Sequence, residues 1–370
     1  MAIGVAIDVR NVSRTPSGIG VYVATLIREL SQLDGLEIHL FGTKYTQFPD
    51  YEGLETHILP TGARFHWAAI RKFKRMNLGV YHSPNSGIVP YFLGEKSVLT
   101  IHDLVPVLFP NTASIGSRLA HYFIKLASRK CGAIISVSES TKNDIIKIWN
   151  PNSDIHVIWS GSDRIQDVEN TDIEGLEIPD EFYLCVGTLE PRKNLSTLLR
   201  AYFNALESGE DLPPILVVGS EGWRGESKKL LSLAERHPDK VRFCGYLDDG
   251  SLALIYSKAK ALFFPSMYEG AGLPPLEAAY FGTGIVCSNI PSLKEVFADD
   301  AIFIDPLDVK GWERILLELN HNSEVLERLG ENCHKTAKRY TFYQAAIKTK
   351  SVYGEVFKYA LRSGELEGDY

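Results

Sequence analysis

Cysteine and long apolar runs are both scarce in this sequence, and each shortage excludes a class of protein. Its 370 residues contain five cysteines, an odd and scattered set, so a disulfide framework is not expected. Four of them lie at or inside expected strands, which favours small buried thiols in a reducing cytoplasm: Cys131, Cys185, Cys244 and Cys287. No pair of Cys or His residues has the spacing of a zinc site. No apolar run is long enough to span a membrane.

An excess of positive charge is also missing. The formal net charge is −7, which argues against a nucleic-acid partner. The first residues, Met1 to Asp8, have no basic segment and reach an acid too early for a signal peptide. A content of 45% apolar and 23% charged residues is typical of a globular protein, and this length favours two domains. We therefore expect a cytoplasmic protein.

Short apolar runs alternate with helical patterns along the whole chain, which predicts an α/β protein with parallel sheets and crossover helices. The expected strands are 4–9, 37–42, 55–59, 79–82, 97–102, 133–137, 155–159, 182–187, 215–219, 241–244, 261–265, 284–288 and 301–304. The expected helices are 21–33, 117–129, 139–149, 195–208, 227–236, 252–260, 274–281, 309–319, 324–340 and 343–361.

A polar stretch at residues 160–179 separates two halves of this pattern and is expected to be a linker. We therefore predict two Rossmann-like, doubly wound domains at residues 1–165 and 166–342, facing each other across a cleft at the carboxyl ends of their strands. Ligands of such folds bind at that edge.

A glycine loop between two carboxylates is the most informative stretch. Glu269 follows the expected strand 261–265, and Glu277 is expected in the first turn of the next helix, with Pro274 or Pro275 at its first position. Gly270 and Gly272 let backbone amides approach a ligand at the positive end of the helix dipole. An acid that merely complements the dipole would explain Glu277 but not Glu269 or the glycines, so we favour a binding site.

A second strand end carries two adjacent cations. The segment from Gly187 to Asn194 includes Arg192 and Lys193 and leads into a helix. Cations oppose the dipole at a helix N-terminus. A bound diphosphate would compensate for that mismatch, and we favour this over a solvated surface pair.

Three further loops give weaker signals. Gly18 and Gly20 open a helix but lack the third glycine of a dinucleotide fingerprint. His102 and Asp103 end a strand at the expected cleft, where a substrate contact and a structural role are equally expected. The loop Gly245–Leu247, which includes Tyr246, could seat a planar base through its backbone.

A basic segment, Arg64–Arg75, contains five cations and no acid, with Phe65, Trp67, Ile70 and Phe73 on one face of the expected helix. It could lie on an anionic membrane or pack into the core with a solvated basic face. The sequence leaves both readings open.

Taken together, these motifs resemble those of retaining glycosyltransferases of family 4 with the GT-B architecture, and in particular of bacterial O-antigen mannosyltransferases. The segment Glu269–Glu277 is the most specific part, followed by Glu190-Pro-Arg-Lys-Asn194. Gly18-Ile-Gly20, His102-Asp103 and Ser136–Thr141 match in order and place. One departure is Ala271, where the family often has Phe.

The resemblance implies a role for each residue. Arg192 and Lys193 would neutralise the diphosphate of a nucleotide-sugar donor, aided by Gly187, while Gly18 and Gly20 close over it. Glu277 would accept hydrogen bonds from the ribose, and the Gly245–Leu247 backbone would meet the base. Glu269 and the amides of Gly270, Ala271, Gly272 and Leu273 would hold the donor sugar. His102 would contact the sugar or the acceptor, with Asp103 orienting it. The last helix, within 343–370, would return to the first domain.

The implied reaction is transfer of a sugar with retention to a glycan or a lipid-linked acceptor, without a metal ion or a cofactor. GDP-mannose is the favoured donor, with UDP-sugars as an alternative, and the acceptor, the linkage and the oligomeric state stay open. Rival interpretations are a nucleotide-sugar epimerase of similar fold, a two-domain binding protein and a nicotinamide dehydrogenase. The missing export signal and the missing third glycine count against the last two.

Overall fold

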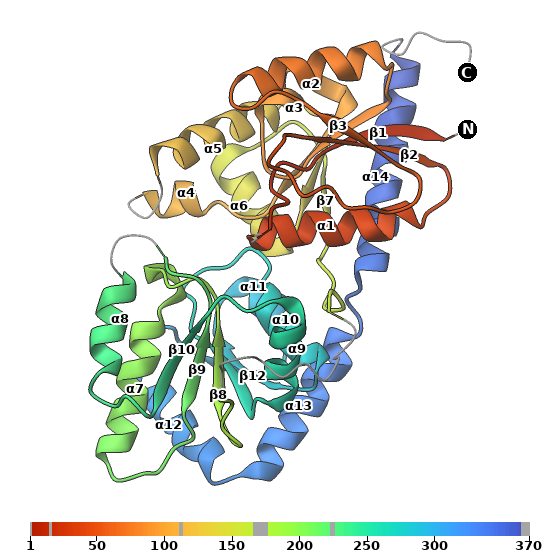
Figure 1. The fold of residues 1–370 in the computed structure, drawn as a ribbon. Coiled ribbons are helices and arrows are strands. Elements are labelled where there is room, and N and C mark those ends of the chain that lie inside the picture. Colours follow the sequence, from red (N-terminus) through yellow and green to blue (C-terminus); the bar gives the residue numbers. More distant parts are fainter. Residues whose placement is uncertain (1, 15–16, 111–113, 166–176, 223–225, 364–370) are drawn as a thin grey trace. The chain divides into compact units, whose positions relative to one another are not determined.

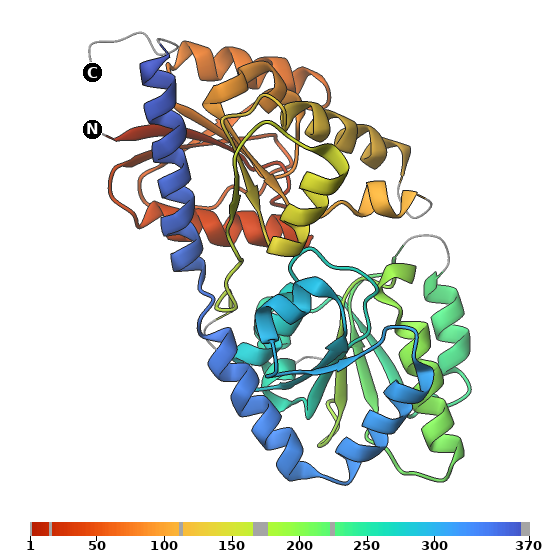
Figure 2. The same ribbon diagram turned by 180° about the vertical axis from the view of Figure 1, so that it is seen from behind.

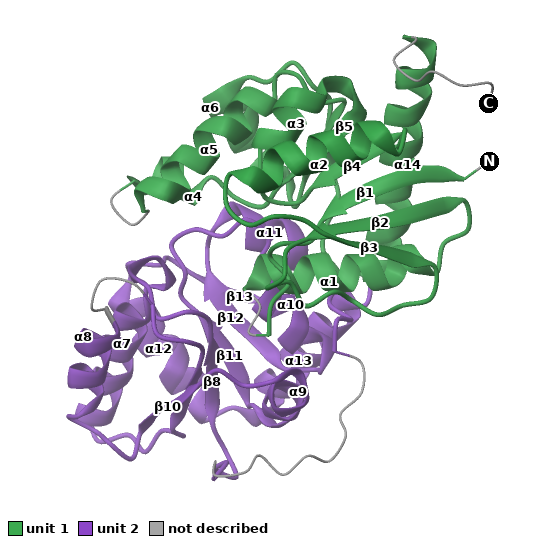
Figure 3. Cartoon of the chain, turned by 45° about the horizontal axis from the view of Figure 1, so that its top comes forward, with its two compact units in different colours: residues 1–161, 341–370 green, residues 162–340 purple. Residues whose placement is uncertain are grey.

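The computed structural model describes residues 2–14, 17–110, 114–165, 177–222 and 226–363, and it divides into two compact units (Figure 3). Unit 1 comprises residues 1–161 and 341–370, and unit 2 comprises residues 162–340. The first boundary precedes the expected one at 165 because Ser162 belongs to unit 2. Its hydroxyl donates to the carbonyls of Ala337 and Tyr340, at 2.9 and 3.0 Å. Of the expected linker, residues 166–176 lie outside the described residues.

Unit 1 is built on a seven-stranded sheet in which all paired strands are parallel (Figure 1). In spatial order the strands are β3 (Leu54–Ile58), β2 (Leu36–Gly42), β1 (Ile3–Asp8), β4 (Val80–Ser83), β5 (Ser97–Ile101), β6 (Ala133–Ser136) and β7 (Ile155–Val157). The strand order reverses between β1 and β4, which places a switch point at the carboxyl end of β1.

Helices cover both faces of this sheet because successive strand residues point to opposite sides. Val5 and Ile7 of β1 pack with α1 and α14, whereas Ala6 packs with α2 and α3. The helices of unit 1 are α1 (Gly18–Ser31), α2 (Arg64–Arg75), α3 (Ile88–Leu93), η1 (Gly94–Lys96), α4 (Val105–Leu108), α5 (Ile115–Ala127), α6 (Glu139–Trp149) and α14 (Phe342–Arg362).

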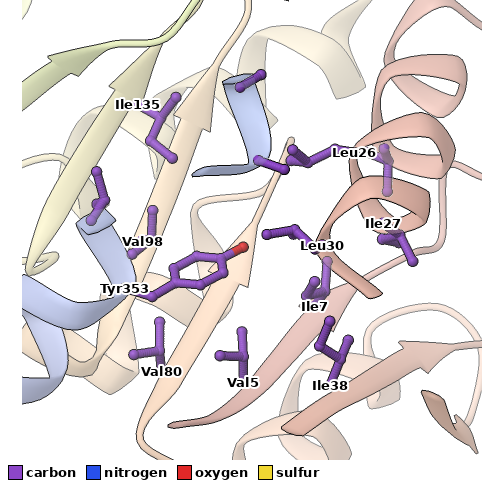
Figure 4. Close-up of a cluster of buried hydrophobic side chains, with 14 of the residues drawn as sticks. Val5, Ile7, Leu26, Ile27, Leu30, Ile38, Val80, Val98, Ile135 and Tyr353 are labelled. Atoms are coloured by element: carbon purple, nitrogen blue, oxygen red, sulfur yellow. The ribbon is translucent and has the colours of Figure 1, made fainter. Parts of the chain in front are cut away.

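The last helix of the chain, α14, completes the core of unit 1 (Figure 2). Its N-cap is Thr341, whose hydroxyl accepts a hydrogen bond from the Gln344 amide at 3.2 Å. Tyr353 lies among side chains of the sheet and of α1, close to Val80 and Val98 (Figure 4). Its hydroxyl contacts Nδ1 of the buried His82 at 2.6 Å, so α14 is fixed by a polar contact as well as by apolar packing.

Unit 2 repeats the architecture with a six-stranded parallel sheet (Figure 1). In spatial order its strands are β10 (Val241–Gly245), β9 (Ile215–Val218), β8 (Tyr183–Val186), β11 (Ala261–Phe264), β12 (Gly284–Ser288) and β13 (Ile302–Ile304). Its helices are η3 (Pro191–Lys193), α7 (Leu195–Glu207), α8 (Glu226–Ala234), α9 (Asp249–Lys258), α10 (Leu273–Tyr280), α11 (Pro291–Phe297), α12 (Val309–Asn320) and α13 (Ser323–Ala337). The order reverses between β8 and β11, so the loops after these two strands meet at a switch point.

Two doubly wound parallel sheets confirm the predicted fold class, and every expected strand is present with ends within two residues of its expected position. Several short helices were not predicted, among them α3, which contains Pro90, and α11. Within the described residues, none of the helices combines the length and the apolar character that crossing a bilayer requires.

Candidate functional site

The two cations predicted to bind a diphosphate lie on η3, in the loop that joins β8 to α7. Asn194 fixes the end of this loop, since its left-handed backbone (φ 55°) ends η3 and precedes α7. Its side-chain amide donates to the carbonyls of Pro265 and Pro306, at 3.1 and 2.6 Å. Gly187 lies against the stem of Lys193, because a Cβ at this glycine would lie 3.2 Å from Lys193 Cε. The loop therefore holds both cations at the carboxyl edge of the sheet.

Arg192 and Lys193 converge on Glu269. Nη1 of Arg192 and Nζ of Lys193 lie 2.9 and 2.8 Å from the same Glu269 oxygen, Oε1. Arg192 also pairs with Glu190 at 2.9 Å and donates to the Tyr268 carbonyl at 2.6 Å. Burial alone would raise the pKa of Glu269, but the charges of Arg192 and Lys193 lower it to about 2. Glu269 is thus a buried, ionised carboxylate at the focus of two cations.

Both cations of this cluster already have acidic partners. A bound polyanion was expected to compensate the cations at the start of α7, yet Glu190 and Glu269 already neutralise much of their charge. Both cations are mostly covered, with side chains 12% and 17% exposed. An anion at this place would share the cations with Glu269 and would not meet two free charges.

The glycine loop has the expected shape with a shifted helix start. Gly272 adopts a left-handed conformation (φ 73°), and a Cβ there would lie 2.6 Å from the Leu293 side chain, so a glycine is required. The helix α10 begins at Leu273, which puts Pro274 at its second position. Glu277 therefore lies in the second turn and not in the first, where its carboxylate can reach a neighbouring helix.

Glu277 belongs to a second ion-pair network. Its Oε1 accepts from Nε of Arg164 at 2.7 Å, and its Oε2 accepts from the Tyr256 hydroxyl at 3.1 Å. Arg164 also pairs with Asp249, at the start of α9. The side chains of Arg164 and Glu277 are 7% and 5% exposed. Burial alone would lower the pKa of Arg164, but Glu277 and Asp249 raise it above its ordinary value.

Sequence reasoning missed Arg164, which lies 113 residues before its partner in a polar stretch expected to be a linker. The structure brings Gly187, Arg192, Lys193 and Glu269 together in one cluster. Glu277 lies outside this cluster and pairs with Arg164.

The loop expected to meet a base is open to solvent. Gly245 has a positive φ of 68°, and the Tyr246 side chain is exposed. The neighbouring Asp248 accepts a hydrogen bond from the Ser251 amide at 2.8 Å and so caps α9. Asp248 is therefore a helix cap, whereas the next residue, Asp249, forms an ion pair with Arg164.

In unit 1 the structure brings His102 next to α1, the helix that begins at Gly18. The edge of the Tyr22 ring faces the His102 ring, with centroids 4.8 Å apart. Burial lowers the pKa of His102 to about 4, although a hydrogen bond with the Pro84 carbonyl acts against this. Nε2 of His102 is buried and has no hydrogen-bond partner among the described residues. This neutral imidazole has one nitrogen left for a ligand.

Asp103 has a different role from the expected one. Its Oδ1 accepts a hydrogen bond from the Val105 amide at 2.9 Å, at the start of α4. His102 is held by Pro84 and by Tyr22 instead. Of the two glycines before it in the chain, Gly20 is buried in α1, and a Cβ on Gly18 would meet no atom within 4 Å.

A pocket of about 280 Å³ lies at the end of β1 and was not predicted. It is lined by Asp8, Arg10 and His66, among others. Asp8 and Arg10 form a two-pronged ion pair with distances of 2.9 and 2.7 Å, and the guanidinium lies 3.9 Å from the centre of the Phe65 ring. Nδ1 of His66 is buried and lacks a hydrogen-bond partner within the described part of the chain. The pocket thus offers charged and neutral polar groups on rigid elements.

The basic helix α2 packs into unit 1. Phe65, Ile70 and Phe73 are buried in its core, which uses the face that would otherwise enter a membrane. Trp67 stays 62% exposed beside Phe92, with ring centroids 5.0 Å apart. The structure therefore supports the reading of a core-packed helix with a solvated basic face.

Comparison with known proteins gives two family matches. Residues 16–164 match the family model described as Glycosyltransferase Family 4, and residues 168–336 match the one described as Glycosyl transferases group 1. The chain is 29% identical to O-antigen chain mannosyltransferase B of Escherichia coli over 314 residues, covering 81% of this chain and 79% of that protein. It is 26% identical to O-antigen chain mannosyltransferase RfbU of Salmonella typhimurium over 269 residues, covering 71% of each.

Solved structures share the fold at low identity. Sucrose-phosphate synthase from Thermosynechococcus elongatus matches with a TM-score of 0.78 and 19% identity, covering 96% of this chain and 99% of that chain. Alr3699/HepE from Anabaena, solved in complex with UDP and glucose, matches with a TM-score of 0.73 and 16% identity, covering 94% and 98%. The architecture is therefore GT-B.

Proposed function

Because this chain belongs to the glycosyltransferases, we propose that it transfers mannose from GDP-mannose to a glycan or lipid-linked acceptor in the synthesis of a surface polysaccharide. The names of the relatives from Escherichia coli and Salmonella typhimurium support the sugar and the pathway. The observation that carries the chemistry is the pair of cations, Arg192 and Lys193, held against the buried Glu269.

Charge stabilisation of the leaving group is the central step. As the bond from the sugar to the diphosphate breaks, negative charge grows on the diphosphate and positive charge grows at the anomeric carbon. Arg192 and Lys193 stabilise the diphosphate, together with the backbone amides at the start of α10. Glu269 lies beside both cations and faces the positive sugar. Fixed groups of this kind need little rearrangement when the charge develops.

Retention follows if the acceptor attacks from the face that the diphosphate leaves, with the diphosphate accepting the acceptor's proton. His102 contacts the sugar through its free Nε2, and its low pKa keeps the ring neutral at pH 7. The acceptor's hydroxyls bind in the pocket of Asp8, Arg10 and His66. Glu277, held by Arg164, accepts a hydrogen bond from the ribose, and Tyr246 lies beside the base.

Arg192 and Lys193 supply the positive charge that a divalent ion supplies at other diphosphates, so we propose that transfer needs neither a metal nor a cofactor. Turnover by the purified enzyme should be unchanged in the presence of a chelator. A loss that added Mg²⁺ or Mn²⁺ restores would refute this part of the proposal.

The base of the donor is the least constrained part. A UDP-sugar is the alternative donor, supported by the UDP complex of the Anabaena protein of the same fold. A ligand that binds only the native state raises the melting temperature, so a panel of sugar nucleotides tests the choice directly. Stabilisation by UDP-sugars and not by GDP-mannose would overturn the favoured donor. Consumption of the donor without any acceptor would indicate an epimerase.

The location of the acceptor determines whether the enzyme works at a membrane. We propose electrostatic contact between the basic face of α2 and anionic lipid, with Trp67 at the interface, because the apolar face of α2 is already buried. Sedimentation with anionic vesicles that weakens as salt is added would support this. Equal binding to neutral vesicles would contradict it.

The direct test of the mechanism is substitution of the cations. Arg192→Ala and Lys193→Ala should each lower kcat by about 10²–10³-fold, the loss typical of removing one group that stabilises transition-state charge. Arg200→Ala is the matched control, since this arginine is exposed on α7 and should leave turnover unchanged. Near-normal rates in both site variants would refute the assignment.

A further inference from the structure

Two histidines and two glutamates gather on one face of unit 1, at the edge of its sheet. In the parallel register His39 of β2 lies opposite Glu55 of β3, and Phe41 lies opposite His57. Because alternate residues share a face, His39, Glu55 and His57 point to the same side, as does Glu37. His39 is buried, whereas Glu37 and Glu55 reach solvent. This cluster lies outside the residues to which transfer is assigned above.

Three ligand atoms of the cluster converge. Nδ1 of His39 lies 3.2 Å from Nε2 of His57 and 3.2 Å from Oε2 of Glu55. The remaining side of the triangle, from His57 Nε2 to Glu55 Oε2, measures 3.9 Å. A circle through three points with these separations has a radius of about 2.0 Å, which matches the Zn–N and Zn–O distances of about 2.0–2.2 Å in proteins.

The fourth residue of the cluster, Glu37, determines which ring nitrogen of His39 carries the proton. Nε2 of His39 lies 3.2 Å from Oε1 of Glu37. When the neutral ring donates from Nε2 to this carboxylate, Nδ1 carries only a lone pair. That lone pair then faces a second imidazole nitrogen and the Glu55 carboxylate, an arrangement that is repulsive unless a cation or a proton lies between them. Carboxylates that accept from the outer nitrogen of a metal-binding histidine are a regular feature of zinc sites.

We propose that His39, Glu55 and His57 bind a divalent transition-metal ion of the Zn²⁺ class, with Glu37 as the outer carboxylate and a fourth position open to water. Two imidazoles and one carboxylate form a donor set that suits zinc. The ion links β3, the edge strand, to β2 and fixes their register. Spacing along the sequence did not reveal the site because its ligands come from two strands.

The positive charge of a neighbouring lysine, Lys72, should weaken binding of a metal ion, so its removal provides a control. Lys72 on α2 is close enough for its charge to act on His57. Removing that charge should strengthen binding of a cation, whereas it would not strengthen a hydrogen bond between two neutral histidines. The Lys72→Met variant therefore separates the two explanations of the cluster.

Calorimetric titration of the chelator-treated full-length protein with ZnCl₂ tests the proposal. We expect one Zn²⁺ per chain, at least tenfold weaker binding for His57→Ala and Glu55→Gln, and roughly 10- to 100-fold weaker binding for Glu37→Gln. Lys72→Met should bind more tightly. Both Glu variants change exposed side chains, so they do not depend on the tolerance of the core to substitution.

The control is His156→Ala. His156 lies on β7, at the opposite edge of the same sheet, and its Nε2 is 3.6 Å from a carboxylate oxygen of Glu355 on α14. This variant should leave the affinity for Zn²⁺ unchanged. Binding of Co²⁺ should give the visible absorption of a four-coordinate ion in the wild type and lose it in His57→Ala. Absence of stoichiometric Zn²⁺ binding, or binding that His57→Ala and Glu55→Gln leave intact, would overturn the proposal and indicate a cluster held together by protons.

Discussion

Replacing Glu269 by Gln isolates the charge at the centre of the candidate site. The amide keeps the shape of the side chain and removes its negative charge. Arg192 and Lys193 then lie beside each other, mostly covered, without the carboxylate that both contact in the native protein. Removing one partner of a buried pair is costly because it leaves the other charge uncompensated. We therefore expect unit 2 to lose stability.

The size of the loss follows from the pKa of Glu269. The native value of about 2 lies well below the ordinary 4.5. At 1.36 kcal/mol for each tenfold change, the charged form is favoured by about 3 kcal/mol, and Gln approximates the uncharged form. Because a lowered carboxyl pKa stabilises the native state at every pH above the unfolded value, the loss should be constant from pH 7 down to pH 5. For a unit of this size it corresponds to roughly 6–12 °C in Tm.

Urea and thermal denaturation of wild type and Glu269→Gln measure this difference. Trp312 is fully buried in α12, so it contributes to the change in fluorescence when unit 2 unfolds, together with the four other tryptophans of the chain. Glu190→Gln is the matched control, since it removes another partner of Arg192 from a more exposed position and should cost less than about 1 kcal/mol. Equal stability losses in the two variants would refute the assignment of Glu269 as the buried focus of the cluster.

Three further predictions follow from the same structure. Burial lowers the pKa of His82 to about 3 and that of His102 to about 4, so between pH 6.5 and 5 these two side chains take up protons in the unfolded chain and hardly at all in the native one. Their protonation should therefore lower the free energy of unfolding of unit 1 by about 2–4 kcal/mol over this range. Urea titrations at both pH values measure this difference, and the free energy of unfolding should depend less on pH in His102→Ala than in the wild type. Gly272→Ala should cost about 1–3 kcal/mol in thermal denaturation, because its φ of 73° is strained for alanine. Arg164→Ala should cost about 3–5 kcal/mol, since Glu277 loses its buried partner, and should raise the KM for the donor in steady-state assays.

Two of these variants have a control within the chain. Gly282 also has a positive φ of 83° but open space around its Cβ direction, so Gly282→Ala measures strain without the added contact. Asp249→Asn removes the exposed partner of Arg164 and should cost little. A variant that matched its control would contradict the corresponding prediction.

The fold was predictable because its signals are local. Buried parallel strands are short apolar runs, and turn-forming residues separate them. These two signals predict the ends of thirteen strands to within two residues of their observed positions. The loops after strands could also be predicted, since Arg192, Lys193 and Glu269 all follow a predicted strand. A helix such as α3 was missed because Pro90 and an apolar composition mask the helical period. Propensity is a weak guide for a six-residue helix fixed by its surroundings.

The partners of the site residues could not be predicted, because pairing depends on tertiary distance. Nothing near Arg164 indicates that it meets Glu277, 113 residues later. Asp103 was expected to orient His102, yet its carboxylate reaches the Val105 amide two residues on, the local bond that an aspartate makes most readily. The spacing of His39, Glu55 and His57 along the sequence does not indicate a metal site. These residues come together only because β2 and β3 pair in parallel register.

The two carboxylates of the glycine loop, Glu269 and Glu277, have different partners, so their contributions to transfer and to donor binding can be measured separately. Glu269 accepts from two cations on η3, so any diphosphate that approaches Arg192 and Lys193 competes with it and gains less Coulomb energy than two free cations would give. Glu277 accepts from Arg164 and Tyr256, which fix its orientation without involving Arg192 or Lys193. Changes at Glu269 should therefore alter anion binding and the transfer step together, whereas changes at Arg164 should raise the KM for the donor and leave the transfer step unchanged. If Arg164→Ala lowered kcat as strongly as Lys193→Ala at saturating donor, this division between the two carboxylates would be wrong.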